Sequence, residues 1–252
     1  MRFVDTHCHL EQAEFESDRE EVIRRAAEQE IVIITSAIST ENYERNLLIA
    51  QNHENVYASL GLDPMFHTQV EKAAQGIHDH SSEIIAIGET GLDHYRERDH
   101  AERLKQETAF VKMIGLSKEL GLPIQVHSRS AGAAALLVLQ KNDAQSVHMH
   151  AFDGKAGLAR NSSKNLGYYF SIPTSVVRSP QKRKLVKAVA LDRLLLETDS
   201  PVLSPNREVR NEPSNLPIAL RNVASILGRD VEEMREIILE NTLRLYTGIG
   251  ET

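Results

Sequence analysis

Residues 31–36 read Ile-Val-Ile-Ile-Thr-Ser, a short run that is apolar at four consecutive positions. A strand with one face in water would alternate apolar and polar residues, so this run is typical of a strand covered on both faces. Residues 194–196, Leu-Leu-Leu, repeat the pattern near the far end of the chain. Strands buried on both faces are typical of parallel sheets flanked by helices, so the pattern predicts an α/β fold.

Further runs of strand length recur along the chain. The candidate strands cover residues 2–6, 31–36, 56–60, 84–88, 123–127, 146–150, 168–172 and 194–197. Segments with helical spacing lie between them, for example 18–28 and 102–120, and two more at 217–227 and 231–246 follow the last strand. Eight strands alternating with helices in 252 residues predict a (β/α)8 TIM barrel. A doubly wound open sheet has the same alternation and is the alternative.

Composition and charge limit the class of protein. No low-complexity linker divides the 252 residues, so we expect one domain over residues 1–252. A formal net charge of −7 excludes a generally basic nucleic-acid-binding protein, although a local basic patch could still hold phosphates. One cysteine excludes an internal disulfide. Without a signal-like start or an 18-residue apolar stretch, we expect a soluble cytoplasmic protein with no membrane partner.

Potential metal ligands stand at the C-terminal ends of five candidate strands. A barrel would bring these strand ends together at one mouth. The candidate ligands are His7, His9, Glu89, His127, His150 and Asp199. A mixed nitrogen and oxygen set suits Zn²⁺ or Mn²⁺, and the carboxylates also tolerate Mg²⁺. The pattern therefore predicts a divalent-metal centre at the mouth of the barrel.

The first two motifs suggest how ligands and their neighbours are arranged. His7 and His9 are two residues apart, so on a strand both point to the same side. Asp5 shares that parity and could hold a histidine ring through its second nitrogen. Glu89 directly follows an apolar strand, and one carboxylate can offer an oxygen to each of two ions. Asp93 could orient a ligand, and a turn-stabilising role is equally expected.

The later motifs leave one alternative open. His148 and His150 have the same parity, and we favour His150 as the ligand because it lies at the exit of the strand. Glu197 and Asp199 follow the apolar run 194–196. A buried acidic pair is costly unless a metal ion, another cation or a proton compensates it. We expect Asp199 to bind metal and Glu197 to support the ligands.

The motifs around these residues occur in a fixed order along the chain. They are FVDTHCHL at 3–10, GETGLD at 88–93, PIQVHSR at 123–129, HAFDG at 150–154, LETDSP at 196–201, RNEPSN at 210–215 and ENTLRL at 240–245. Together they resemble the TatD-type metal-dependent deoxyribonucleases over nearly the whole chain. The resemblance implies a TIM barrel of the metal-dependent hydrolase type, within the amidohydrolase superfamily. It also implies two divalent ions and hydrolysis of phosphodiester bonds in DNA, often by trimming from a 3′ end.

The resemblance also assigns ligands to the two ions. By the family pattern one ion would be held by His7, His9, Glu89 and Asp199, and the second by Glu89, His127 and His150. One position departs from this pattern, because residues 61–64 read Gly-Leu-Asp-Pro where many relatives read Gly-x-His-Pro. Asp63 replaces an imidazole that could help to hold phosphate. His67, four residues on, is a candidate to take its place.

The expected mechanism uses a water activated by the two ions. Asp199 would accept the proton of that water as general base, and Glu89 would bridge the ions. Arginines near the mouth would bind the phosphate chain, and the candidates are Arg129, Arg207 and Arg210. Arg129 ranks first because it follows the ligand His127 by two residues.

Two other functions share the same ligand set. An amide or ester hydrolase, such as an enzyme that removes D-amino acids from tRNA, would direct the activated water at a carbonyl. Asp63 slightly favours this alternative, because an acid repels phosphate but accepts hydrogen bonds from an amine. A non-catalytic metal-binding protein is the third possibility, and the complete ligand set with Asp199 in place argues against it.

Overall fold

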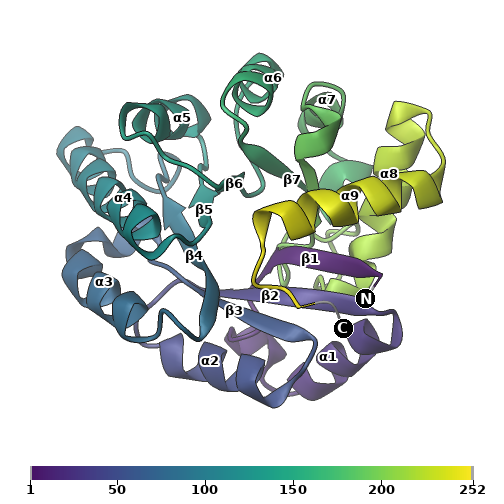
Figure 1. Cartoon of the computed structure of the whole chain (residues 1–252), viewed down its shortest axis with the longest axis horizontal. Coiled ribbons are helices and arrows are strands. Elements are labelled where there is room, and N and C mark those ends of the chain that lie inside the picture. Colours follow the sequence, from purple (N-terminus) through teal and green to yellow (C-terminus); the bar gives the residue numbers. More distant parts are fainter. Residues whose placement is uncertain (1, 251–252) are drawn as a thin grey trace.

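The strands form a parallel barrel in the computed structural model, which describes residues 2–250 (Figure 1). They are β1 (Phe3–Cys8), β2 (Ile31–Ala37), β3 (Val56–Leu60), β4 (Ile84–Gly91), β5 (Ile124–His127), β6 (Val147–Met149), β7 (Tyr169–Pro173) and β8 (Leu194–Glu197). Each strand pairs with the next one in the sequence, in the order β1 to β8. The last strand, β8, returns to lie beside β1, so the barrel nearly closes. There the Thr6 hydroxyl donates to the Leu196 carbonyl at 2.8 Å. The predicted TIM barrel is confirmed, and the sequential order excludes the doubly wound alternative.

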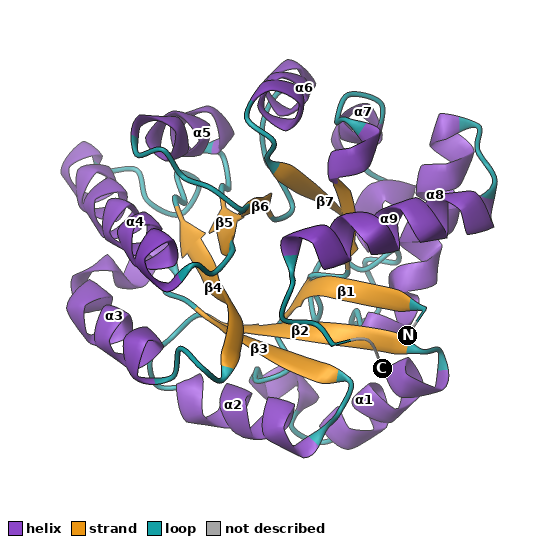
Figure 2. Cartoon of the chain, viewed as in Figure 1, coloured by secondary structure: helices purple, strands orange, loops and turns teal. Residues whose placement is uncertain are grey.

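Helices follow the strands and form a ring outside them (Figure 2). They are α1 (Arg19–Glu28), α2 (Tyr43–Asn52), α3 (Val70–Asp79), α4 (His100–Leu120), α5 (Gly132–Lys141), α6 (Ala156–Asn165), α7 (Pro180–Val186), α8 (Leu216–Leu227) and α9 (Val231–Leu245). The last two both follow β8, and α9 packs on β8 and β1, where the barrel closes. In residues 2–250 no helix has the length and apolar character needed to cross a membrane.

Capping residues explain where the longest helix begins and ends. The Asp99 side chain accepts hydrogen bonds from the backbone N–H groups of Ala101 and Glu102, so α4 starts two residues before the predicted position. Gly121 ends the helix in a left-handed conformation, with φ of 66°. The chain then turns directly into β5, as the sequence of Gly121 and Pro123 predicts.

The apolar core has two layers. The larger layer lies between the strands and the helices and includes Cys8, which faces outward as expected. The smaller layer gathers Val4, Val32, Ile34, Ala86, Tyr169 and Leu195 from the strands with Leu245, Tyr246 and Ile249 from the C-terminal segment. Residues just beyond α9 therefore complete the apolar core of the strands.

Bulges interrupt the two strands that carry the first ligands. In β1, Asp5 pairs with Ile33 and Cys8 with Thr35, so β1 holds one extra residue over this stretch. In β4, a similar shift falls between Ile87 and Thr90, around Glu89. Bulges redirect side chains locally and are common beside active sites. As a result Val4 and Cys8, which would share a face in a regular strand, belong to the inner and outer layers respectively.

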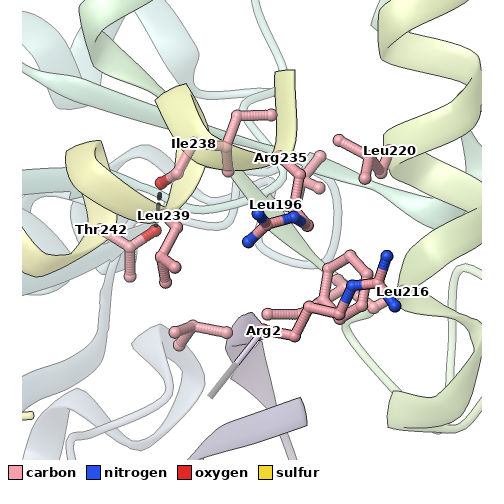
Figure 3. A pocket seen from close by; sticks show the side chains of 10 residues that line it. Arg2, Leu196, Leu216, Leu220, Arg235, Ile238, Leu239 and Thr242 are labelled. Carbon is pink, nitrogen blue, oxygen red and sulfur yellow. Dashed lines mark hydrogen bonds between the residues drawn. The ribbon is translucent and has the colours of Figure 1, made fainter. Parts of the chain in front are cut away.

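A small cavity of about 10 Å³ lies where α8 and α9 cover β1 and β8 (Figure 3). Apolar side chains make up most of its wall. Arg2 and Arg235 also line it, and both pair with Glu232, at 3.4 and 2.6 Å. The cavity has room for about one water, and both arginines in its wall are paired. It is therefore a small gap in the packing between helices and strands.

Candidate metal centre

Four histidines surround the carboxylate of Glu89 at the C-terminal end of the barrel. Its Oε2 atom lies 2.8 Å from His7 Nε2, 3.6 Å from His9 Nε2 and 3.3 Å from His150 Nε2. Its Oε1 atom lies 3.1 Å from His127 Nδ1. One carboxylate therefore faces two sets of imidazoles with its two oxygens.

Asp199 completes the cluster from the chain that leaves β8. Its Oδ1 atom lies 3.5 Å from His9 Nε2 and 3.9 Å from His7 Nε2. Its backbone has a left-handed φ of 55°, and its N–H donates to the His7 carbonyl at 2.9 Å. Such a conformation is strained for most residues, and Asp and Asn tolerate it best. The strained turn thus places this carboxylate next to the histidines of β1.

The ligand atoms form three overlapping groups, and within each group all atoms lie within 4.8 Å of one another. The groups are His7–His9–Glu89, His7–His150–Asp199 and Glu89–His127–His150. The structure therefore brings all six candidate ligands into one cluster. His150 lies in it and His148 does not, so of these two histidines only His150 is placed where it could bind a metal ion with the others.

The second nitrogen of each histidine ring meets an acceptor. His7 Nδ1 lies 2.9 Å from Gln125 Oε1, His9 Nδ1 2.8 Å from the Ser36 carbonyl, His127 Nε2 3.3 Å from Asp93 Oδ2, and His150 Nδ1 3.3 Å from Glu197 Oε2. An acceptor at that position requires the hydrogen there and leaves the other nitrogen free to bind a metal ion. Asp93 and Glu197 therefore contact the rings of candidate ligands, His127 and His150 respectively, as the sequence analysis expected of residues that orient or support ligands.

A chain of buried hydrogen bonds joins His7 to His150 beneath the cluster. The Gln125 amide donates to Tyr246 Oη at 3.0 Å, the Tyr246 hydroxyl to His148 Nδ1 at 2.6 Å, His148 Nε2 to Ser171 Oγ at 2.7 Å, and the Ser171 hydroxyl to Glu197 Oε2 at 2.6 Å. Burial lowers the pKa of His148 to about 3, so its ring is neutral, with one donor and one acceptor. That single donor and single acceptor match its two partners.

Charge within the cluster determines which rings hold protons. Burial alone would lower the pKa of His9 and of His127. Nearby carboxylates outweigh burial, namely Asp199 and Glu89 at His9 and Glu89 and Asp93 at His127. They raise both pKa values to about 10. Burial would raise the pKa of Glu89, and the charges of His150 and His127 outweigh it and hold that pKa well below its usual range. The Glu89 carboxylate therefore stays ionised at the centre of the cluster, where it attracts protons or metal cations.

Two buried ligand atoms in the described part of the chain have no hydrogen-bond partner, namely Glu89 Oε2 and His127 Nδ1. Leaving such atoms buried and unpaired costs about 1–3 kcal/mol each in ordinary protein interiors. They belong to a set of four imidazoles and two carboxylates at short mutual distances. A divalent cation would satisfy these atoms, so the residues present fit a metal site.

A cavity of about 440 Å³ opens over the cluster. It is lined by His9, Gln12, Glu89, His127, Ser128, Arg129, His150, Ala151, Asp153, Lys182, Asp199, Val202 and Leu203. Lys182, which sequence reasoning missed, donates to the carbonyls of Ala151 at 2.7 Å and Phe152 at 2.9 Å. It therefore holds the loop after His150 and adds a positive charge to the cavity wall.

Four other predicted residues lie against protein groups. Both oxygens of Asp63 accept from Arg96, which also pairs with Asp93, so Asp63 supports a residue that orients His127. Asp5 accepts from the N–H and hydroxyl of Thr198, the residue before Asp199. His67 Nε2 lies 3.1 Å from a Glu102 oxygen, and Arg210 forms a two-bond pair with Asp18. Arg207 lines a neighbouring groove over residues 201–210.

Sequence reasoning missed several residues that support the ligands, and the sequence contained a usable signal for one of them. Gln125 is a polar side chain inside the apolar strand Ile124–His127, and a buried polar residue in that place indicates a specific partner. Tyr246 carries no such signal, because its contact with His148 spans 98 residues. Glu11 was also missed; it is buried near His9, and burial raises its pKa to about 7.

Known proteins are similar to this chain in sequence and fold. The pattern of the family described as TatD related DNase matches residues 4–247. The human deoxyribonuclease TATDN3 is 36% identical, with 96% of this chain and 94% of the human protein covered. An uncharacterized metal-dependent hydrolase from Methanocaldococcus jannaschii is 34% identical over 98% of this chain and 97% of that protein.

The solved structures agree with the sequence comparison. The crystal structure of YjjV, a TatD homologue from Escherichia coli K12, superposes with a TM-score of 0.88 at 28% identity, covering 98% of both chains. The family pattern spans the strands that carry the six ligands. The chain belongs to the TatD-related DNase family of metal-dependent hydrolases.

Proposed function

We propose that this chain hydrolyses phosphodiester bonds of DNA, with two divalent ions held by the cluster around Glu89. The observation that carries the proposal is the position of this carboxylate, with one oxygen facing His7, His9 and His150 and the other facing His127. A shared carboxylate between two nitrogen sets suits a pair of ions. When bound, such ions lower the pKa of a water and neutralise charge on the phosphate.

The chain's own residues supply the remaining parts of the reaction. Asp199 borders the cavity and lies beside His9, so its carboxylate accepts the proton of the attacking water. Arg129 and Lys182 line the same cavity and face the phosphate with positive charge. Their charges offset the net charge of −7 locally, where the substrate binds.

Amide or ester hydrolysis loses the one residue that slightly favoured it. That residue was Asp63, as an acceptor for an amine. In the structure both Asp63 oxygens accept from Arg96 Nη2, at 2.5 and 2.6 Å, so Asp63 is committed to the protein. The deoxyribonuclease hypothesis needs no such acceptor and agrees with the name of the human relative.

We infer that the enzyme removes nucleotides from the 3′ end of single strands. A cavity of 440 Å³ is of small-ligand size, which suits a strand end better than the middle of a duplex. We place the activity in the cytoplasm, where reducing conditions suit the one buried, unpaired cysteine, Cys8.

The test follows single-stranded DNA labelled at its 5′ or 3′ end, mixed with Mn²⁺-loaded protein. Trimming from the 3′ end gives a ladder of shortening 5′-labelled products and immediate release of labelled mononucleotide from the 3′-labelled strand. EDTA should abolish both. Asp199→Asn should lower kcat by at least about 100-fold, as expected for loss of a general base.

The Asn variant also serves as a control for folding. Asn tolerates the left-handed backbone at position 199, where φ is 55°, so the melting temperature should stay close to that of the wild type. Retained activity in this variant would refute the role of Asp199. Failure of the metal-loaded wild type to cleave either strand would refute DNA hydrolysis itself.

A further inference from the structure

Arg129 and Tyr95 form a stacked pair at the edge of the metal cavity. The guanidinium carbon of Arg129 lies over the Tyr95 ring, 4.0 Å from its centroid. Arg129 lines the cavity together with Glu89 and His127. Tyr95 does not line it; Tyr95 lies in the loop after β4, where it packs against Arg129 and is 53% exposed. The pair therefore presents a flat cationic surface beside the metal ligands.

The backbone fixes this pair to the ligand strands. The N–H of His94 donates to the carbonyl of Arg129 at 3.0 Å, which ties the loop after β4 to the loop after β5. The N–H of Tyr95 donates to Asp93 Oδ1 at 3.0 Å, and the other Asp93 oxygen meets the ring of His127. The stacked pair and a metal ligand therefore share one anchoring carboxylate.

Arg129 differs from the other arginines near the site in its partners. Arg96 is held by Asp63 and Asp93, and Arg210 is held by Asp18. Among residues 2–250 no carboxylate lies within 4.0 Å of the Arg129 guanidinium. A guanidinium stacked on a ring and free of a carboxylate keeps its N–H donors for a phosphate and its second face for another planar group.

We propose that Arg129, backed by Tyr95, forms a stacking platform for a nucleobase next to the scissile phosphodiester. The proposal rests on the proposed function, because it takes a DNA strand as the ligand. Stacking on aromatic and guanidinium planes accepts every base, since each base has a π face. The platform therefore selects strands that carry bases over sugar-phosphate chains that lack them, without selecting one sequence.

The first experiment compares hydrolysis of two strands, one normal and one with abasic residues at its last two positions. Stacking contributes about 1–3 kcal/mol per base, so the wild type should prefer the normal strand by about 5- to 150-fold in kcat/KM. Arg129→Lys keeps the charge and removes the plane, so the preference should fall close to one. Tyr95→Ala should act in the same direction, whereas Tyr95→Phe keeps the ring and should keep the preference.

Arg98→Lys is the matched control, because Arg98 is an exposed arginine in the same loop as Tyr95. It should leave the preference unchanged. If Arg129→Lys lowers kcat/KM equally for both strands, Arg129 contacts phosphate alone and the platform is refuted. A wild type that cleaves both strands equally well also overturns it.

A binding experiment separates this proposal from DNA hydrolysis. Asp199→Asn protein is mixed with a single strand that carries 2-aminopurine at its end, and stacking of that base quenches its fluorescence. Quenching that disappears on Arg129→Lys or Tyr95→Ala supports the platform even if the wild type hydrolyses no DNA. Hydrolysis by the wild type without quenching by the Asn variant would leave the proposed function standing and remove the platform.

Discussion

Glu89 and the histidines around it show how one residue sets the charge of a site. Its carboxylate is buried and within 3.6 Å of four imidazoles. Two of these, His9 and His127, take up protons readily because carboxylates surround them, with pKa values of about 10. Metal ions and protons therefore compete for the same nitrogen atoms at neutral pH.

This competition predicts that metal affinity rises with pH. His9 and His127 must lose a proton before they bind a metal ion, and both hold it up to a pH of about 10. Below that pH, each rise of one pH unit should lower the dissociation constant of the metal ion by up to about tenfold for each proton displaced. Calorimetric titration of Mn²⁺ in two buffers of different ionisation enthalpy measures the protons released. Identical heats in both buffers, with equal affinity at pH 6.5 and 8.5, would contradict it.

At the scale of the elements, close backbone contact between β3 and β4 holds Glu89 in place. A Cβ atom at Gly61 would lie 2.2 Å from the Glu89 carbonyl oxygen and 2.4 Å from the Gly88 carbonyl carbon. Real Cβ contacts are never so short, so only glycine lets the strand that carries the shared ligand approach β3. The bulge in β4 lies at the same place, around Glu89.

We expect Gly61→Ala to displace Glu89 and weaken metal binding. Overpacking of this kind costs about 1–3 kcal/mol of folding free energy, and the shift of the ligand should lower bound metal below the wild-type stoichiometry. Metal content after dialysis and thermal melting measure the two effects. Gly115→Ala is the control, because a Cβ there meets nothing within 4 Å and a helical alanine should add about 0.5–1 kcal/mol. Full metal content in Gly61→Ala would disprove the positioning role.

The elements were largely predictable from the sequence, and the contacts of long side chains were not. Apolar runs and helical spacing located the strands, and ligands at strand ends followed from the barrel itself. The bulge in β1 extends that strand to Cys8, two residues past the predicted end, which no local pattern indicated. Arg210 and Asp63 were expected to bind substrate, but neighbours distant in sequence, Asp18 and Arg96, determine where their charges lie.

At the scale of the whole molecule, the C-terminal segment supports a site whose residues come from strands all around the barrel. Tyr246 follows α9, lies inside the barrel and is completely buried. Its hydroxyl accepts from Gln125, which orients His7, and donates to His148, which leads through Ser171 and Glu197 to His150. Each donor in this chain of hydrogen bonds has one acceptor, so the chain fixes which nitrogen of His7 and His150 faces Glu89.

Tyr246→Phe tests this long-range support. Loss of the hydroxyl leaves His148 Nδ1 without its donor, which should cost about 1–3 kcal/mol of stability. It also removes one of the hydrogen bonds that hold the Gln125 amide, which keeps Thr6 and Ser36 as partners, so metal affinity should fall by about tenfold, the lower limit seen when ligand-orienting groups are removed. Calorimetry and chemical unfolding measure the two quantities. Tyr57→Phe is the control, since the Tyr57 hydroxyl contacts only the backbone N–H of Gly250 among the described residues. If Tyr246→Phe lost stability but kept wild-type metal affinity, Tyr246 would be a core residue alone, and His7 and His150 would be oriented by their nearest neighbours.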